Sequence, residues 1–213
     1  TTAYTAGIHS GIAGFYDRYP RIPFGRATNY TEDNMKKFQL CYPYMRRLNK
    51  LFADLVPNRY EHQKAITEGI DKRFIVAEDT AFSTITVNKN YRTTAHRDGA
   101  NLEGGFSNLS TVTKDGIGWS GGLFVLPEFR VAINLRPGDA LLVDNANIIH
   151  GNTEIIPPEG MDVEDMERIS LVSYMRDGMS ELGSKEYEDA RHDYVQERSR
   201  NKDHKLWRER WNG

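Results

Sequence analysis

Cysteine is almost absent from this sequence: Cys41 is the single cysteine among 213 residues. One thiol excludes an internal disulfide framework and a metal site built from several thiolates, and it fits a reducing compartment. Any bound metal ion must therefore be held by histidine and carboxylate side chains. Long hydrophobic runs are also missing, because no stretch approaches the roughly 18 apolar residues needed to cross a bilayer. Residues 1–10 lack the pattern of a secretory signal, so we expect no membrane partner and an intracellular location.

Repeats, low-complexity tracts and linkers rich in proline or serine are lacking too. A domain boundary therefore has no place to fall, and the length is typical of one domain. We expect a single domain over residues 1–213, with a helical N-terminal part over residues 1–80, a β-rich core over 81–176 and a helical tail over 177–213. Trp207 and Trp211 in the tail lie four residues apart, which is typical of a packing stripe on a helix.

Hydrophobic periodicity separates these parts. Between Met35 and Leu55 apolar residues recur every three or four positions, which predicts a helix with one buried face. We expect a kink or break near Tyr42, before Pro43, and an end at Pro57. The core consists of short β-rich runs, which are Phe82–Val87, Ser107–Thr113, Gly122–Leu126, Val131–Leu135, Ala140–Val143, Asn147–His150 and Ile169–Tyr174. Such runs without helical segments between them favour a sandwich or jelly roll, so the expected fold is mainly β with flanking helices (α+β).

The formal net charge of -2 conceals an uneven distribution. Residues 15–50 contain eight basic and three acidic side chains, whereas residues 154–167 contain six acids and no base. A pI near 6.3 argues against general binding of polyanions, but a confined basic patch suits an enzyme that acts on nucleic acid. Ordinary solvated helix faces give the same pattern, so both interpretations stay open.

A metal site is indicated within the β-rich region. His96 and Asp98 form a His-x-Asp pair after the first predicted strand, and His150 follows a Pro-Gly-Asp turn and a further strand. Residues two apart on an extended chain share a face, so the pair presents an imidazole and a carboxylate together. A histidine from another strand then completes a face of three ligands, which is typical of non-haem Fe(II) oxygenases that bind a 2-oxo acid and O₂. A His-x-Asp pair alone is a weak signal, and its context carries the hypothesis.

The last predicted strand adds a candidate anion-binding arginine. Alternation directs Arg168, Ser170 and Tyr174 to one face. A buried arginine with a hydroxyl two residues on suits the distal carboxylate of 2-oxoglutarate. The alternative is that His96 and His150 are ordinary core histidines and Arg168 forms a surface ion pair. Asp98 at the third ligand position favours hydroxylation or oxidation over halogenation, which would need a small residue there.

Together these residues resemble the TET/JBP family of 2-oxoglutarate- and Fe(II)-dependent dioxygenases, which oxidise the 5-methyl group of pyrimidines in DNA. The stretches that carry the resemblance are Ala95–Gly105, Gly122–Pro127 and Arg168–Val172, together with Gly14–Arg21 and Gly25–Thr28, which look similar to compact fungal and phage-like members. The resemblance covers most of residues 14–176. It implies a double-stranded β-helix core, the jelly roll or cupin-like fold.

The resemblance also implies a cofactor and a co-substrate. Fe(II) would be bound by His96, Asp98 and His150, with O₂ as the second co-substrate. Arg168, helped by Ser170, would bind the distal carboxylate of 2-oxoglutarate. Arg92 lies close to where the family places a second carboxylate-binding arginine.

The implied partner is double-stranded DNA that carries a methylated pyrimidine. A methyl group inside a duplex cannot reach iron, so the nucleotide must be flipped out, stacked on a ring and recognised along its edge. Asn101 falls where members hydrogen-bond the flipped base, Tyr174 where an aromatic ring stacks on it, and Arg26 in the stretch that closes over it. Arg176 stands two residues after the stacking ring, where cytosine-oxidising relatives tend to carry histidine. Because arginine only donates, it favours a different edge such as the carbonyl oxygens of thymine.

Several alternatives stay open from the sequence. The target base is 5-methylcytosine, oxidised to 5-hydroxymethylcytosine or further, or thymine, oxidised to 5-hydroxymethyluracil. A hydroxylase of the same fold that acts on a free nucleotide, amino acid or other small metabolite is the second hypothesis. A non-catalytic jelly-roll binding module is the third. A DNA-modifying enzyme would be nuclear in a eukaryote and cytoplasmic in a bacterium or phage host, and the sequence does not indicate an oligomeric state.

Overall fold

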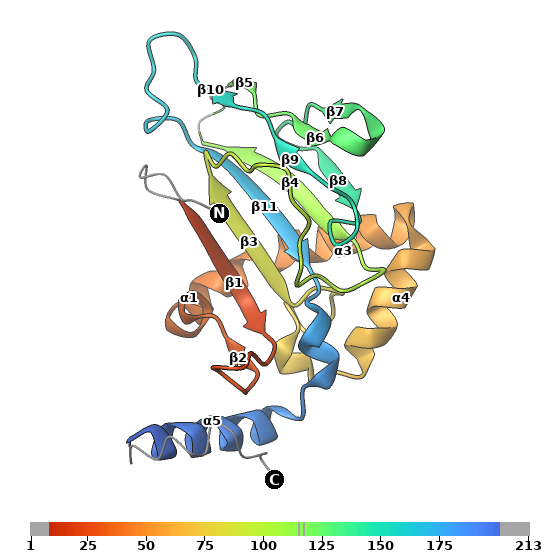
Figure 1. Ribbon diagram of the computed structural model, residues 1–213, viewed down its shortest axis with the longest axis vertical. Coiled ribbons are helices and arrows are strands. Elements are labelled where there is room, and N and C mark those ends of the chain that lie inside the picture. Colours follow the sequence, from red (N-terminus) through yellow and green to blue (C-terminus); the bar gives the residue numbers. More distant parts are fainter. Residues whose placement is uncertain (1–8, 115, 117, 201–213) are drawn as a thin grey trace.

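The computed structural model describes residues 9–114, 116 and 118–200, and its strands form facing sheets with helices packed outside one of them (Figure 1). The strands are β1 (Ser10–Tyr16), β2 (Arg26–Ala27), β3 (Thr84–Lys89), β4 (Ser107–Thr113), β5 (Ser120–Gly121), β6 (Phe124–Leu126), β7 (Val131–Ile133), β8 (Ala140–Val143), β9 (Gly151–Asn152), β10 (Ile155–Ile156) and β11 (Arg168–Tyr174). The helices are α1 (Asn29–Asp33), α2 (Met35–Phe38), α3 (Tyr42–Leu55), α4 (Pro57–Glu68) and α5 (Lys185–Arg200), with 3₁₀ turns η1 (Gln39–Cys41), η2 (Lys72–Phe74), η3 (Pro127–Phe129) and η4 (Asp177–Glu181).

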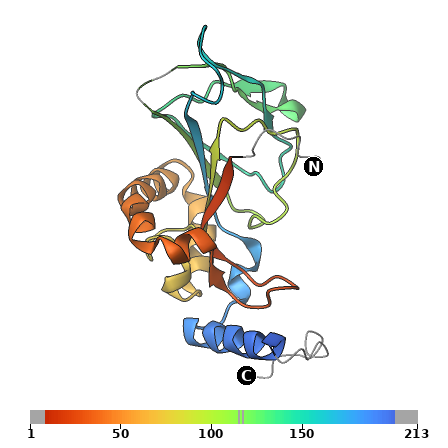
Figure 2. The same ribbon diagram turned by 90° about the vertical axis from the view of Figure 1, so that its left-hand side faces the viewer.

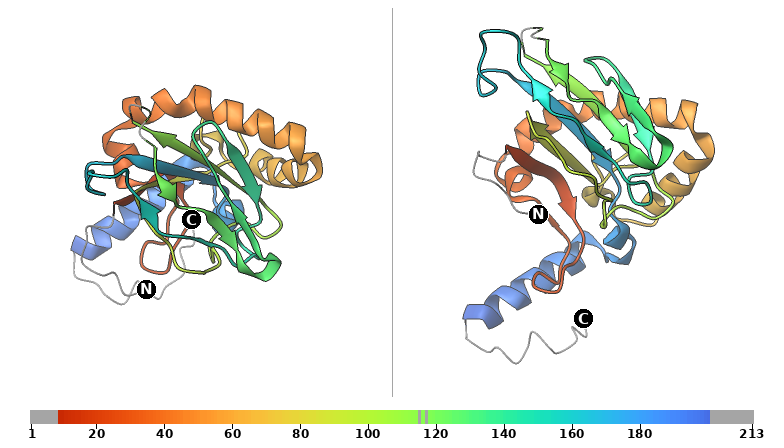
Figure 3. Two further views of the ribbon diagram at one scale, coloured as in Figure 1. Left: turned by 90° about the horizontal axis from the view of Figure 1, so that it is seen from above. Right: turned by 45° about the horizontal axis from the view of Figure 1, so that its top comes forward.

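The large sheet has the strand order β2-β1-β3-β11-β4-β8, and all its pairings are antiparallel. β11, late in the chain, lies between β3 and β4, so the last strand closes the centre of the sheet. The small sheets, β7-β6-β9 and β10-β5, lie over one face of the large one (Figure 3). The apolar layer between them contains Leu109 and Val143 from the large sheet and Phe124 from the small one. These facing sheets form the expected double-stranded β-helix.

The two faces of the large sheet serve different purposes. Ile85 on β3 and Leu171 on β11 face the helices, where they pack with Met45 and Phe52 of α3. Figure 2 shows α3 and its neighbours against this face, on the side away from the small sheets. Strand residues alternate between faces, so Ser170 and its neighbours at even positions of β11 are left for the other side. The main core therefore lies behind the large sheet, and the front face is free to carry a site.

The predicted helix over 35–55 is present but divided. Residues 29–55 fold as α1, α2, η1 and α3, and α3 begins at Tyr42 with Pro43 in its first turn. Proline suits that position because its missing N–H would have no intrahelical partner there. The apolar pattern ends before Pro57 as predicted, but Pro57 also starts α4, a helix that the pattern did not predict.

The N-terminal part is not wholly helical, which corrects the expectation for residues 1–80. β1 pairs with β3 along five residue pairs and is an integral strand of the large sheet. Gly11 and Gly14 lower its intrinsic strand propensity, so the strand is stabilised by backbone pairing that the sequence pattern does not reveal. The predicted strand Asn147–His150 is a turn instead, with the Asn147 backbone N–H donating to Asp144 Oδ1 at 3.2 Å.

In the segment predicted as a helical tail, residues 177–181 form η4 and residues 185–200 form α5, whereas Trp207 and Trp211 lie outside the described residues. α5 is fastened to the N-terminal segment through Glu188, whose side chain is fully buried. Its carboxylate accepts hydrogen bonds from the backbone N–H groups of Gly25 (2.7 Å) and Gly183 (2.9 Å) and pairs with Arg18. Within the part of the chain that the structure describes, no helix has the length and apolarity to cross a membrane.

Candidate active site

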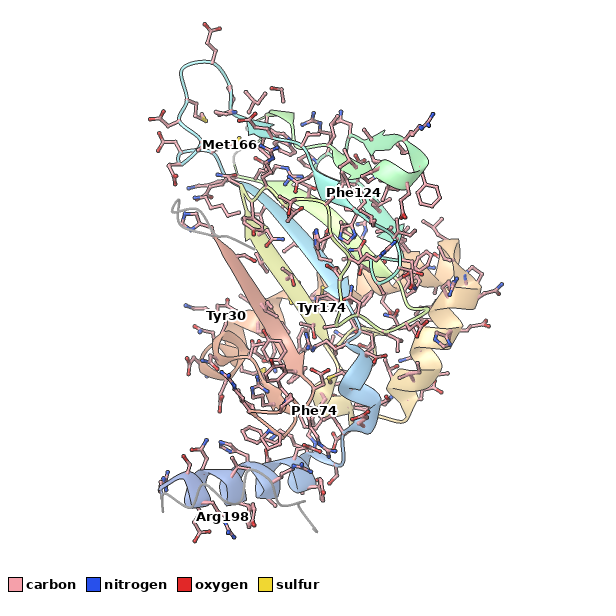
Figure 4. The ribbon with its side chains drawn as sticks, viewed as in Figure 1. Tyr30, Phe74, Phe124, Met166, Tyr174 and Arg198 are labelled. Atoms are coloured by element: carbon pink, nitrogen blue, oxygen red, sulfur yellow. The ribbon has the colours of Figure 1, made fainter. Side chains whose placement is uncertain are left out.

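A cavity of about 340 Å³ lies between the large sheet and the segments that face it. Its lining includes the predicted site residues His96, Asp98, Asn101, His150, Arg168, Ser170 and Tyr174. Arg168 begins β11 and Tyr174 ends it, so these two side chains mark opposite ends of the cavity floor. Phe124 on the small sheet contributes to the opposite wall, and Figure 4 labels it together with Tyr174.

The two histidines are backbone partners. The N–H of each donates to the carbonyl oxygen of the other at 2.9 Å, and their rings lie 4.4 Å apart between centroids. Asp98 Oδ1 lies 3.2 Å from His96 Nε2 and 3.8 Å from His150 Nε2. One ligand atom from each of the three residues lies within 4.8 Å of the others. The structure thus brings the predicted triad together.

Both imidazoles are oriented for metal binding. Nδ1 of His96 lies 2.8 Å from the carbonyl oxygen of Thr94, and Nδ1 of His150 lies 2.9 Å from that of Ile148. A carbonyl oxygen only accepts, so Nδ1 carries the proton and the lone pair of Nε2 faces Asp98. Burial also lowers the pKa of His150, which favours the neutral, ligating form. Two neutral imidazoles and one carboxylate fit the donor set of a non-haem Fe(II) centre.

Arg168 is placed to receive an anion. Its side chain is buried, and its Nε has no hydrogen-bond partner among the described residues, while one terminal nitrogen lies 3.4 Å from the carbonyl oxygen of Gly122. Burial, and secondarily the charge of Arg136, lowers the pKa of Arg168 to about 10. A buried, unpaired cation is costly, and a carboxylate would offset that cost. The residues present therefore fit 2-oxoglutarate at this end of the cavity.

Hydroxyl groups accompany this arginine. Ser170 lines the cavity and pairs across the sheet with Thr111 on β4, so both side chains point to the same face. Thr111 Oγ1 is buried without a hydrogen-bond partner in the described part of the chain. Of the two, only Ser170 is among the residues that line the cavity, so its hydroxyl is the one that an acceptor bound in front of Arg168 would contact.

The residues proposed to recognise a base lie at the other end of β11. Tyr174 lines the cavity and is 7% exposed, and Thr86 Oγ1 donates to its hydroxyl at 3.4 Å. Arg176 does not line the cavity: its Nε donates to Asp17 at 2.6 Å, and its guanidinium lies over the ring of Tyr16. Its backbone pairs with that of Asn101, which does line the cavity.

Asn101 has an additional contact that the sequence did not indicate. Its amide nitrogen lies 3.2 Å from Asp98 Oδ2 and 2.9 Å from Ser107 Oγ. The Asn101 amide therefore donates to the carboxylate of a candidate metal ligand. This geometry gives Asn101 a second role, the orientation of Asp98, besides recognition of the base.

Like Arg176, two further predicted site residues lie away from the cavity. Arg92 is exposed and is not among the residues that line it. Arg26 lines a different hollow of about 650 Å³ between the N-terminal segment and α5, with its guanidinium 4.9 Å from the centroid of the Tyr16 ring. The structure thus separates these two arginines from the His96, Asp98 and His150 cluster.

Sequence reasoning missed residues that hold the ligand segment in place. Asn152 Oδ1 accepts from the backbone N–H and the hydroxyl of Thr93, both at 2.7 Å. The carbonyl oxygen of Asn145 accepts from the backbone N–H of Asp98 at 2.9 Å. The sequence offered one indication of this role, because Asn145 and Asn152 flank the candidate ligand His150. Trp119 and Arg136, which contact Arg168 or lie beside it, had no such indication, because they come from an irregular loop and a turn.

The positions of the basic residues in segment 15–50 favour the interpretation that they are ordinary solvated helix faces. Five of its eight cations, Lys36, Lys37, Arg46, Arg47 and Lys50, lie on α2 and α3, which cover the face of the sheet opposite the cavity. Arg46 pairs with Asp79, and Lys50 pairs with Asp54. This cluster therefore does not frame the cavity.

A jelly roll whose cavity holds two histidines, one carboxylate and an unpaired buried arginine is the architecture of a 2-oxoglutarate- and Fe(II)-dependent oxygenase. Residues 11–177 match the Tet_JBP model, described as the oxygenase domain of the 2OGFeDO superfamily. The chain belongs to this family, so the resemblance in the sequence is confirmed.

Named relatives are similar to this chain in sequence, and one solved structure is similar to it in fold. The bifunctional helicase and thymine dioxygenase JBP2 of Trypanosoma brucei brucei is 35% identical over 173 residues, covering 80% of this chain and 15% of that protein. The thymine dioxygenase JBP1 of Crithidia fasciculata is 28% identical over 178 residues, covering 82% and 21%. This chain therefore spans a small part of these relatives. The structure of NgTET1 in complex with 5mC DNA shares the fold, with a TM-score of 0.64 at 14% identity, covering 87% of this chain and 69% of that one.

Proposed function

We propose that this protein uses Fe(II), 2-oxoglutarate and O₂ to oxidise the 5-methyl group of a pyrimidine in DNA, after the base has been flipped out of the duplex. The main structural support for this proposal is the arrangement of side chains in the cavity. It joins the ligand atoms of His96, Asp98 and His150, within 4.8 Å of one another, to the buried and unpaired Arg168. Membership of the Tet_JBP family supports the reaction class.

The iron centre, when bound, supplies oxidation of the methyl group: one oxygen atom of O₂ enters the new hydroxyl, and the other enters succinate as 2-oxoglutarate loses CO₂. The chain supplies orientation. The carbonyl oxygens of Thr94 and Ile148 fix the imidazoles, and Arg168 with Ser170 holds the distal carboxylate of the co-substrate. Phe124 stacks on the His150 ring with centroids 5.5 Å apart, which shields that side of the site from water.

Thymine is the first base to test. The curated relatives that cover most of this chain are named thymine dioxygenases, whereas the solved structure contains 5mC DNA. Tyr174, at the end of the cavity away from Arg168, offers the ring on which a flipped base stacks. Asn101 offers a nearby amide for its edge.

The test is a product assay. The protein is reconstituted with Fe(II) without oxygen, then given 2-oxoglutarate, O₂ and duplexes that contain only thymine or also 5-methylcytosine, and the DNA is digested for nucleoside mass spectrometry. We expect a 5-hydroxymethylpyrimidine and succinate, with neither formed by His96→Ala. Succinate formation with no change in either duplex would overturn DNA as the substrate.

A hydroxylase of a small metabolite is the rival that the same cavity allows. Binding to DNA falls steeply with salt because phosphate contacts release counterions, whereas a small substrate lacks that dependence. Turnover of a methylated duplex should therefore fall as salt rises. Turnover of a free nucleotide at a rate that salt does not change would favour the rival. A non-catalytic binding module would form no succinate in either arm.

The proposed function bears on the organisation and location of the chain. We infer that residues 1–213 act as one dioxygenase domain, because β1 belongs to the sheet and Glu188 of α5 is buried against the N-terminal segment. A DNA substrate would place the protein in the nucleus of a eukaryote, or in the cytoplasm of a bacterium or phage host.

A further inference from the structure

Trp119 stands beside the candidate co-substrate arginine. The residue precedes β5 and is 9% exposed, and its ring lies 5.3 Å from the Arg168 guanidinium carbon. It packs with Ile155 and Met166, and Figure 4 shows Met166 at the opposite end of β11 from Tyr174. Trp119 is not among the residues that line the cavity, but its ring packs against Arg168, which lines the end proposed to receive the distal carboxylate.

The indole N–H of Trp119 is buried and has no hydrogen-bond partner within the described residues, and the same holds for Arg168 Nε. The two nitrogens converge. A Cβ built on Gly122 would lie 3.3 Å from Trp119 Nε1 and 3.4 Å from Arg168 Nε. Gly122 lines the cavity and adopts a φ of +61°, so a side chain there would be both strained and directed between the two donors. Buried N–H groups of this kind normally have an acceptor.

Arg136 fixes this tryptophan from the other direction. One of its terminal nitrogens donates to the carbonyl oxygen of Trp119 at 2.9 Å, and its guanidinium lies 5.0 Å from the ring centroid. Neither Arg136 nor Arg168 has an ion pair with an acid in the described part of the chain. Two guanidinium groups flank one indole without a counter-charge, so this end of the cavity favours an anion.

We propose that Trp119 is a binding residue for the distal carboxylate of 2-oxoglutarate, donating its indole N–H to the oxygen that Arg168 does not satisfy, and that Arg136 is its positioning residue. The inference rests on the proposed function, because it assumes that 2-oxoglutarate occupies the cavity. A carboxylate has two oxygens and bridges two donors that approach from different sides. Gly122 keeps the space between the donors open.

The experiment measures binding rather than turnover. Calorimetry on the Fe(II)-loaded protein without oxygen compares 2-oxoglutarate with 2-oxovalerate, in which a methyl group replaces the distal carboxylate. Trp119→Phe keeps an aromatic ring but removes the N–H. We expect it to weaken 2-oxoglutarate binding by about 10-fold, the usual value of a hydrogen bond to a charged group. Binding of 2-oxovalerate, measured by competition, should stay the same.

The outcomes distinguish failure of the role proposed for Trp119 from failure of the proposed function. Equal losses for both ligands would mean that Trp119 only supports the fold of the cavity, and unchanged affinity for both would also overturn its role. Should the wild-type protein bind no 2-oxoglutarate, the proposed function itself fails. Arg136→Gln serves as a second variant if Trp119→Phe does not fold. It should lower the affinity for 2-oxoglutarate and leave the affinity for 2-oxovalerate unchanged, and unchanged affinity for both ligands would contradict the positioning role of Arg136.

Discussion

His96 and His150 form a single antiparallel residue pair, each donating its backbone N–H to the carbonyl oxygen of the other at 2.9 Å. Neither residue belongs to a named strand, so this bridge fixes the ligand segment to the turn that carries His150. The separation of the two imidazoles is therefore set by backbone geometry. The orientation of each ring is set by the hydrogen bond that its Nδ1 donates, from His96 to the carbonyl oxygen of Thr94 and from His150 to that of Ile148.

The first prediction concerns iron. His96→Ala and His150→Ala should each abolish stoichiometric Fe(II) binding, because two remaining ligands do not form a facial triad. Metal content after reconstitution without oxygen measures the effect. His62→Ala, at an exposed histidine, is the matched control and should bind iron like the wild type. Iron retained in both ligand variants would refute the site.

The second prediction concerns Arg168. Arg168→Ala should raise the KM for 2-oxoglutarate by about two orders of magnitude, because it removes the buried charge and its hydrogen bonds together. Iron binding should be nearly unchanged. Arg168→Lys retains the charge but loses the planar fork, so its KM should fall between those of the wild type and the alanine variant. Unchanged kinetics in the alanine variant would count against the assignment.

The sequence predicted those parts of the candidate site that depend only on residues close together in the chain. Spacing of two residues placed His96 beside Asp98, and alternation placed Arg168, Ser170 and Tyr174 on one face of β11. The convergence of Trp119 with Arg168 was not predictable, because it depends on how an irregular loop packs against a distant strand. Arg92 shows the same limit: closeness in sequence to His96 does not fix its direction, and the side chain is exposed.

The fold was predictable to a similar extent. The runs Ser107–Thr113 and Ala140–Val143 appear as β4 and β8 with the expected bounds, since apolar and β-branched residues mark them. β1 was missed because its glycines resemble a loop, and its stability comes from pairing with β3. Pairing with β3 thus determines that residues 10–16 form a strand, which their intrinsic strand propensity does not indicate.

The third prediction separates two roles for Asn101. Its amide nitrogen lies within hydrogen-bond distance of Asp98 Oδ2, so Asn101→Ala should weaken Fe(II) binding by about 10- to 100-fold, as loss of a group that orients a metal ligand does. Titration with Fe(II) in the absence of DNA measures this. If Asn101 serves only to recognise the base, iron affinity will equal that of the wild type, and only DNA binding or turnover will fall.

The fourth prediction concerns how α5 is held. Glu188 is fully buried; burial raises the pKa of its carboxyl, but Arg18 and the backbone N–H groups of Gly25 and Gly183 outweigh this and leave the pKa below its ordinary value. Glu188→Gln breaks a buried ion pair and should cost about 3 kcal/mol of unfolding free energy at pH 7. Glu186→Gln, at an exposed position of the same helix, is the control and should have little effect.

This difference in stability should depend on pH with a definite sign. A carboxyl whose pKa is lower in the folded state stabilises the protein above the pKa of an unfolded glutamate, about 4.3, and that stabilisation is lost as the pH falls through the folded-state value. The gap in unfolding free energy between the wild type and Glu188→Gln should therefore be constant near pH 7 and shrink below about pH 4.3. Urea denaturation at several pH values measures it. A gap that widens on acidification would show that Glu188 is protonated in the folded protein and that a neutral hydrogen bond, rather than an ion pair, fastens α5.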